Sequence, residues 1–181
     1  MNILTQDTYI KAWNFASRVH NGQFIPGTNV PYINHIGLVT MESMCAVIQS
    51  GQISNPDLLI LCSILHDTIE DTGTTYENIK ILFGVDAANG VNALSKNKKL
   101  PTKREQMIDS INRIKAQPLE VWMVKLCDRI TNLQPPPEHW DKEKISAYKT
   151  EAELILSELG PSNTFLEERL RKKINGYNRF I

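Results

Sequence analysis

The stretch from Leu58 to Asp71 reads Leu-Leu-Ile-Leu-Cys-Ser-Ile-Leu-His-Asp-Thr-Ile-Glu-Asp, and it decides the expected fold. Its first eight residues are apolar except Ser63, which is the pattern of a helix buried on every side. Asn55-Pro56 is a favourable start signal, because asparagine caps a helix and proline suits its first position. We expect one central helix that continues to Asp71, with the other elements packed around it.

The end of this helix is acidic and carries the chemistry. His66, Asp67, Glu70 and Asp71 fall within its last turn and a half. At about 100° per residue, all four share one side of the helix. Carboxylates at a helix C-terminus oppose the macrodipole, and packed carboxylates at the end of a buried helix need a cation to neutralise them. The stretch therefore predicts a metal site.

The rest of the chain also has helical periodicity, without a convincing strand pattern. Capping, glycine and proline signals predict further helices from Thr5 to near Gly22, at 36–50, from the capping box Thr74–Glu77 to Gly84, and at 86–94, 102–116, 118–133, 141–159 and 163–175. A length of 181 residues suits one domain. We predict an all-α, single-domain bundle of roughly eight to ten helices over 1–181, with the motifs in about 5–160 and a C-terminal helix at about 163–175.

Composition narrows the function classes. The formal net charge is zero, which gives no electrostatic argument for a nucleic-acid or membrane partner. The three cysteines have no metal-like spacing, and their apolar surroundings indicate reduced core thiols. The N-terminus lacks signal-peptide features, and no apolar run is long enough to span a bilayer. We expect a cytoplasmic protein with a small-molecule partner; homo-oligomer formation is left open.

The metal site needs ligands from other segments, because neighbouring helical side chains such as His66 and Asp67 diverge by about 100°. His35, just before the second helix, and Asp128, in the apolar segment 121–132, are suitable. Nitrogen and carboxylate ligands without thiolates suit Mn²⁺, Fe²⁺ or Zn²⁺ and leave positions for water and substrate. A single buried histidine or aspartate is more often a hydrogen-bonded core residue, but the four together with Glu70 and Asp71 favour a metal site.

Glu70 and Asp71 are candidates for proton transfer. Glu70 lies angularly between His66 and Asp67, where it can reach a metal-bound water. Burial and mutual repulsion can raise the pKa of one carboxyl enough for this work. The alternative is that both residues end the helix or pair with surface cations.

Several other polar side chains are substrate candidates, each with a structural alternative. One basic cluster contains no acidic residue and could bind phosphate or could equally form a solvated charged face. Its members are Lys96, Lys98, Lys99, Lys103 and Arg104. Asn132 follows Asp128 by one turn and can touch substrate or satisfy buried backbone. Tyr148 suits a pocket wall or the core. Arg18 and His20, at the end of the first helix, point toward the site or serve the structure.

At these residues the chain resembles the HD-domain phosphohydrolases, specifically the small alarmone hydrolases related to the hydrolase half of RelA/SpoT homologues. The matching segments occur in family order over roughly residues 9–160: Phe15-Ala16 to His20-Asn-Gly-Gln23, Pro31-Tyr-Ile-Asn-His35, Leu65-His-Asp-Thr-Ile-Glu-Asp71, Phe83-Gly84, Lys98-Lys-Leu-Pro101 and Val124-Lys-Leu-Cys-Asp-Arg-Ile-Thr-Asn-Leu133. A bare His-Asp pair is a weak signal, whereas this ordered set is specific.

The resemblance implies an HD fold and metal-dependent hydrolysis of the 3′-pyrophosphate of a guanosine alarmone, with release of pyrophosphate. It implies Mn²⁺ held by His35, His66, Asp67 and Asp128. It also implies that Glu70 and Asp71 promote attack by metal-activated water. Asn132 and Tyr148 match positions that line the family's nucleotide pocket, and Lys98 matches a phosphate-contacting lysine.

One loop departs from the family pattern. Relatives carry an Arg-Lys pair there, which stacks on the base and grips phosphate, whereas Phe24–Val30 is uncharged. Phe24 is the candidate for stacking instead, and the base is guanine or adenine. Two rival functions are a phosphomonoesterase that releases inorganic phosphate and a non-catalytic sensor that binds an alarmone.

Overall fold

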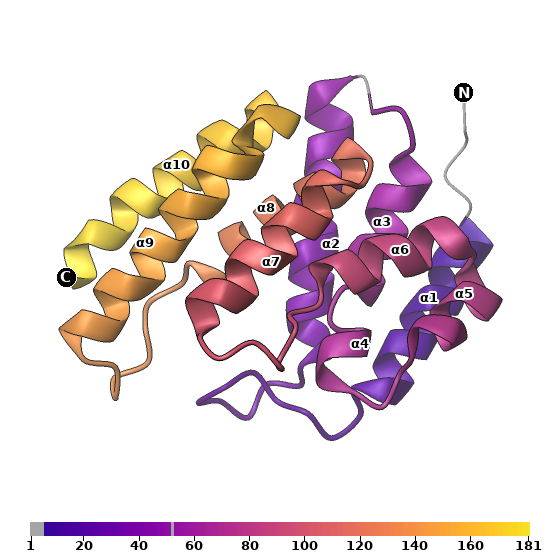
Figure 1. Cartoon of the computed structure of the whole chain (residues 1–181), viewed down its shortest axis with the longest axis horizontal. Helices are drawn as coiled ribbons and strands as arrows, with labels where there is room; N and C mark the ends of the chain where they lie inside the picture. Colours follow the sequence, from indigo (N-terminus) through magenta and orange to yellow (C-terminus); the bar gives the residue numbers. More distant parts are fainter. Residues whose placement is uncertain (1–5, 52) are drawn as a thin grey trace.

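The computed structural model describes residues 6–51 and 53–181, and these are helical with short connections (Figure 1). The α-helices are α1 (Gln6–Val19), α2 (Ile33–Ser50), α3 (Pro56–Leu65), α4 (Thr68–Asp71), α5 (Tyr76–Phe83), α6 (Val85–Leu94), α7 (Lys103–Lys115), α8 (Leu119–Asn132), α9 (Lys142–Leu159) and α10 (Thr164–Tyr177). Two short 3₁₀ turns are η1 (Gly160–Ser162) and η2 (Asn178–Phe180). Within the described ranges, extended pairing is confined to an isolated bridge between Phe24 and Pro31. The all-α prediction is confirmed.

The centre of the fold is α3, as its sequence predicts. Every residue from Leu58 to Leu65 is buried. Helices α1, α2, α6 and α8 pack against it, and α2 and α8 also pack against each other. Figure 1 shows α9 and α10 side by side at one end and α1 with α5 at the other. The metal-ligand candidates therefore come from the three helices that share the middle of the molecule.

The expected single helix from Pro56 to Asp71 is wrong at one point, because α3 ends at Leu65 and α4 begins at Thr68. In a continuous helix, the Ser63 and Leu65 carbonyls would accept backbone N–H groups four residues on. Here His66 Nδ1 lies 2.9 Å from the Ser63 carbonyl, and the Thr68 hydroxyl donates to the Leu65 carbonyl at 2.7 Å. Such side-chain bonds compete with the helix ladder. The result is a turn that carries His66 and Asp67.

Local capping agrees with the sequence except at one helix. Asn55 accepts from the Leu58 N–H, and Asp141 caps α9 in the same way. The capping box of α5 joins Thr75 and Asn78, one residue later than the predicted Thr74–Glu77. The predicted N-cap of this helix was therefore wrong by one residue. The sequence did not decide between the two positions, since threonine occupies both 74 and 75. The predicted cap at Thr5 lies outside the described residues.

The cysteines differ in exposure, which corrects the expectation that all three are core thiols. Cys62 and Cys127 are buried, and burial raises the pKa of each thiol to about 12. Cys45 is exposed on α2. None of the described helices has both the length and the apolar character needed for a membrane crossing.

Candidate metal centre

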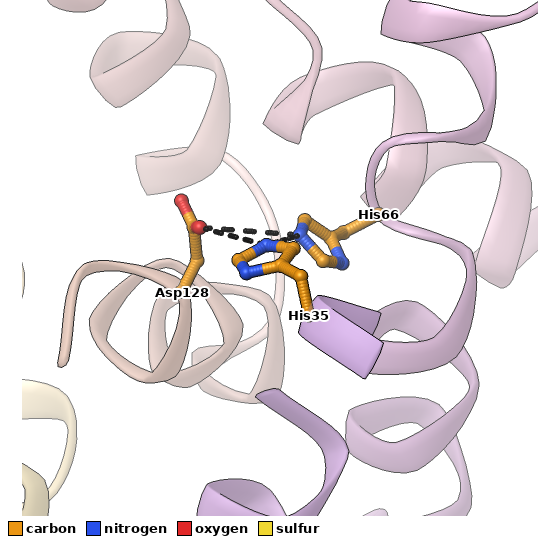
Figure 2. Close-up of side chains that lie close together, drawn as sticks. All are labelled: His35, His66 and Asp128. Carbon is orange, nitrogen blue, oxygen red and sulfur yellow. Dashed lines mark hydrogen bonds and ion pairs between the residues drawn. The ribbon is translucent and has the colours of Figure 1, made fainter. Parts of the chain in front are cut away.

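Three of the predicted ligands converge from three different parts of the chain (Figure 2). His35 lies in the first turn of α2, His66 in the turn after α3, and Asp128 on α8. One ligand atom from each lies within 4.8 Å of the others, and all three residues are buried. His35 Nε2 is 3.3 Å from His66 Nε2 and 3.6 Å from Asp128 Oδ1. This separation suits several donors directed at one small cation.

Asp67 joins the same cluster. Its Oδ2 lies 2.8 Å from His66 Nε2 and 3.6 Å from His35 Nε2. The break between α3 and α4 lets two adjacent residues face one centre, which a straight helix would prevent. The structure thus brings together all four predicted ligands. It does so through the break between α3 and α4, which a projection of one continuous helix does not include.

A set of supporting hydrogen bonds orients these side chains. The Ser63 carbonyl is bonded to His66 Nδ1, so that Nε2 is the nitrogen directed at the cluster. The Tyr32 hydroxyl donates to Asp67 Oδ2 at 2.6 Å. On α8, Lys125 Nζ donates to Asp128 Oδ2 at 3.0 Å, and Asn132 Nδ2 donates to Asp128 Oδ1. Asn132, predicted to touch substrate, contacts a ligand candidate here.

Sequence reasoning missed Tyr32 and Lys125 as supporting residues. A signal was present for Lys125, which precedes Asp128 by three residues and so lies one helical turn before it, whereas the partner of Tyr32 is Asp67, which is distant in sequence. Lys125 was also conspicuous as a lysine inside the apolar run from Val121 to Cys127. An ammonium group at a buried position indicates a nearby carboxylate partner.

The cluster attracts positive charge. Burial disfavours the protonated form of His66, but the carboxylates of Asp67 and Asp128 outweigh it and raise the pKa of His66 to about 9. Burial acts to raise the pKa of both aspartates. Nevertheless, His66 and His35 hold the pKa of Asp67 well below its usual range, and Lys125 and His66 do the same for Asp128. The buried carboxylate of Asp128 and the half-buried one of Asp67, beside two imidazoles, form a donor set that fits a divalent cation.

Glu70 and Asp71 lie on α4, directly after the ligand turn, and both contact a lysine loop. Glu70 Oε2 accepts from the Lys96 N–H at 2.7 Å, and its Oε1 lies 3.6 Å from Lys96 Nζ. Lys98 Nζ donates to the Glu70 carbonyl at 2.7 Å and lies 3.5 Å from Asp71 Oδ1. Burial, with the charges of Asp67 and Glu70, raises the pKa of Asp71 even though Lys98 opposes the shift.

The predicted phosphate cluster divides into two parts. Lys96 and Lys98 contact α4 as described above, and so lie at the edge of the candidate centre. The other three cations, Lys99, Lys103 and Arg104, are exposed. Lys98 is exposed as well, so contact with α4 is what distinguishes Lys96 and Lys98 from the other three, and their role in phosphate binding stays a prediction.

Tyr148 lies beside the α8 residue that follows Asp128. The Arg129 guanidinium is 4.5 Å from the centre of its ring, and the Trp140 ring packs on it edge to face, with 5.2 Å between the ring centres. Arg129 is itself buried and paired with Glu151. Both alternatives for Tyr148, pocket wall and core packing, are compatible with this position.

The remaining candidates lie in or next to the segment between α1 and α2. His20 is buried, bonds Gln23 through Nδ1 at 2.7 Å, and stacks on Tyr32 at 5.2 Å. It therefore supports the residue that bonds Asp67. Arg18 is exposed and lies over the Phe15 ring, beside a groove of about 200 Å³ between α1 and the end of α5. Phe24 is 53% exposed, so its ring is available to a ligand.

Comparisons with known proteins agree with this architecture. The model of the HD domain family matches residues 12–161. Among curated relatives, the guanosine-3′,5′-bis(diphosphate) 3′-pyrophosphohydrolase MESH1 of Danio rerio is 30% identical over 178 residues, which is 95% of each chain. The enzyme of the same name from Xenopus tropicalis is 32% identical over 89% of each chain. The one from Homo sapiens is 30% identical over 90% of each.

A solved structure supports the fold independently. The structure described as "A metazoan ortholog of SpoT hydrolyzes ppGpp and plays a role in starvation responses" superposes with a TM-score of 0.80. The match covers 96% of this chain and 97% of the other, at 23% sequence identity. At that identity the likeness supports the arrangement of helices.

Proposed function

The chain belongs to the HD domain family, in the branch of the alarmone 3′-pyrophosphohydrolases, and from this membership we propose that it hydrolyses the 3′-pyrophosphate of a purine nucleotide alarmone. The products are pyrophosphate and the nucleotide with a free 3′-hydroxyl, and residues 1–181 act as one HD unit. The observation that carries the proposal is the buried cluster of His35, His66 and Asp128 with Asp67 against it, which lies within a family match of 150 residues (12–161).

The four residues would hold a divalent cation, and Mn²⁺ is the proposed ion because imidazole and carboxylate donors both suit it. Such an ion supplies Lewis acidity, which makes water nucleophilic near neutral pH and offsets charge developing on the phosphate. The protein contributes the orientation. The Ser63 carbonyl, Tyr32 and Lys125 fix His66, Asp67 and Asp128 before anything binds.

Glu70 and Asp71 are proposed to move the protons. As the water oxygen forms its bond to phosphorus, its proton passes to a carboxylate oxygen of this pair. The bond between phosphorus and the 3′-oxygen breaks, and the 3′-oxygen then takes up a proton. The raised pKa of Asp71 favours this role, because a carboxylate with a higher pKa takes a proton from the attacking water more readily.

Substrate binding is proposed to involve the two sides of the cluster. Lys98, with Lys96, is placed to hold phosphate oxygens at the α4 edge. Asn132 and Tyr148 are proposed to contact the nucleotide at the α8 edge, with Arg18 and Phe24 reaching it from the α1–α2 segment. Since Phe24–Val30 has no charge, base stacking by Phe24 would admit adenine as well as guanine.

The test is a nucleotide panel with Mn²⁺, in which pyrophosphate and inorganic phosphate are measured separately. Guanosine and adenosine 3′,5′-bis(diphosphates) are compared with 3′- and 5′-monophosphates. Release of pyrophosphate from a bis(diphosphate) is the expected result. Release of inorganic phosphate alone would indicate a phosphomonoesterase, and tight binding without turnover would indicate a sensor. Asp67→Ala and Asp128→Ala should abolish both metal binding and turnover.

A further inference from the structure

Lys125 is a buried cation in direct contact with a predicted metal ligand. It lies on α8, is 6% exposed, and donates to Asp128 Oδ2 at 3.0 Å. The other oxygen of that carboxylate, Oδ1, faces the imidazoles, at 3.6 Å from His35 Nε2 and 4.0 Å from His66 Nε2. Lys125 thus occupies the side of Asp128 that is turned away from the cluster. The facing oxygen is left free of Lys125 and accepts from Asn132 Nδ2.

The position of Lys125 affects the charge balance of the cluster. With a metal bound, both imidazoles would be neutral ligands, so Asp67 and Asp128 would contribute two negative charges and Lys125 one positive charge. Other nearby cations are engaged elsewhere, since Lys96 pairs with Glu70 and Arg129 with Glu151. A buried carboxylate oxygen without a partner is costly, and Lys125 is the partner of Asp128 Oδ2, the oxygen that does not face His66, whether or not a metal is bound. Lys125 is the cation that α8 itself provides.

We propose that Lys125 is a positioning residue and a resident counter-cation of the metal centre. It turns Asp128 Oδ1 toward the ligand cluster and stabilises the cluster in the metal-free protein. It also lowers the affinity for a divalent ion, because the two cations repel each other across Asp128. The inference rests on the metal site of the proposed function. It adds that Lys125 raises the stability of the metal-free protein and lowers its affinity for the metal.

A purely structural ion pair would behave differently. If Lys125 only filled space and bonded Asp128, its loss would destabilise the metal-free and metal-loaded protein to the same extent. If it only oriented Asp128, its loss would weaken metal binding. A counter-cation predicts the opposite sign for binding, together with a stability loss that metal repairs. Coulomb repulsion between charges a few ångströms apart is large in a buried site, so the charge effect should exceed the orientation effect.

The experiment uses the full chain with Lys125→Met, which keeps the volume of the side chain and removes its charge. The Kd for Mn²⁺ is measured by isothermal titration calorimetry, and thermal unfolding is followed with and without Mn²⁺. We expect Mn²⁺ to bind about tenfold more tightly, or more, than in the wild type. We also expect the Tm of the metal-free variant to fall further than that of the loaded variant. Weaker Mn²⁺ binding, or an equal loss of Tm in both forms, would overturn the proposal.

Two further variants keep the result interpretable. Lys125→Gln removes the charge and keeps a hydrogen-bond donor, and should also tighten Mn²⁺ binding. Glu120→Gln is the matched control, because Glu120 is a buried charged residue at the other end of α8 that accepts from the Asn55 N–H. It should shift Tm equally with and without Mn²⁺. If both Lys125 variants fail to fold even with Mn²⁺, the proposal is overturned. If the wild type binds no Mn²⁺, the metal site of the proposed function fails instead.

Discussion

The hydroxyl of Tyr32 donates a 2.6 Å hydrogen bond to Asp67 Oδ2, the same oxygen that lies 2.8 Å from His66 Nε2. The negative charges around the phenol, with its burial, raise the pKa of Tyr32 far above its ordinary value. The hydroxyl therefore stays protonated and remains a donor throughout the physiological range. This bond ties the segment before α2 to the turn between α3 and α4.

Tyr32→Phe should weaken Mn²⁺ binding by about tenfold, because supporting partners of metal ligands typically contribute this much. The phenyl ring retains its stacking on His20 and His35, so the fold should survive. The measurement is the Kd for Mn²⁺ by calorimetry, with circular dichroism to confirm helicity. An unchanged Kd would mean that Asp67 is oriented without the phenol.

The metal-free protein should lose stability at alkaline pH. The pKa of His66 is raised from 6.5 to about 9, so the protonated imidazole stabilises the fold. This contribution is complete below pH about 6.5 and disappears as the pH rises through 9, with an upper magnitude of about 3 kcal/mol. Urea unfolding of chelator-treated protein at pH 6 and pH 9.5 measures it. Mn²⁺ should remove most of the difference, and a pH-independent free energy of unfolding would contradict the charge assignment.

Glu70→Gln and Asp71→Asn should each lower kcat by about 100-fold to 10,000-fold, the usual contribution of a proton-transfer group. Mn²⁺ affinity should change little, since neither residue is among the four proposed ligands. The measurement is kcat for pyrophosphate release together with the Kd for Mn²⁺. Glu77→Gln, at an exposed position on α5, is the matched control and should retain wild-type turnover. A loss of metal binding in either α4 variant would reassign that residue as a ligand.

Lys98→Ala should raise KM for the alarmone more than it lowers kcat, because an exposed lysine is expected to contribute through phosphate binding. Its ion pair with Asp71 is largely solvated, so the free energy of unfolding should change by less than about 1 kcal/mol. Steady-state kinetics at two salt concentrations provides the test. Lys99→Ala, an exposed neighbour, should have a clearly smaller effect on KM. Equal effects of the two variants would indicate general attraction rather than a specific contact.

Much of this architecture could be predicted from apolar periodicity and capping residues. The buried character of α3 and the ends of α6 to α9 follow from local sequence. The turn at His66 and Asp67 could not be predicted in this way, since both residues keep right-handed backbone angles. The interruption comes from side chains that take the Ser63 and Leu65 carbonyls, and nothing in helical periodicity encodes that competition.

The site shows the same division. The ligand types could be predicted because histidine and aspartate in apolar surroundings need partners. The supporting role of Tyr32 depends on how α2 packs against α3, and no local pattern encodes it. Lys125 and Asp128 lie one turn apart on α8, so their pairing was accessible from the sequence. The loop that carries Phe24 is held by a bridge to Pro31 and by hydrogen bonds within the loop, and these contacts do not follow from helical periodicity.

The close packing of α6 against α3 and α8 leads to a prediction about Gly90. A Cβ at this position would lie 2.6 Å from Cys62 Sγ and 3.0 Å from Val121 Cγ2, both in the buried core. Gly90→Ala should therefore destabilise the protein by about 1–3 kcal/mol, the usual cost of overpacking, even though alanine is the better helix former. Urea unfolding measures the change, and Cys62→Ala in the same chain should recover part of it.

Gly176→Ala provides the matched comparison for this substitution. Gly176 is exposed within α10, and a Cβ there would meet no atom within 4 Å among the described residues. With the steric cost absent, the lower backbone entropy of alanine in the unfolded chain should stabilise the protein by about 0.5–1 kcal/mol. The same substitution, glycine to alanine, is thus expected to lower the free energy of unfolding at position 90 and to raise it at position 176. If Gly90→Ala were also stabilising, α6 and α3 would have to move apart readily enough to relieve the 2.6 Å contact between the new Cβ and Cys62 Sγ.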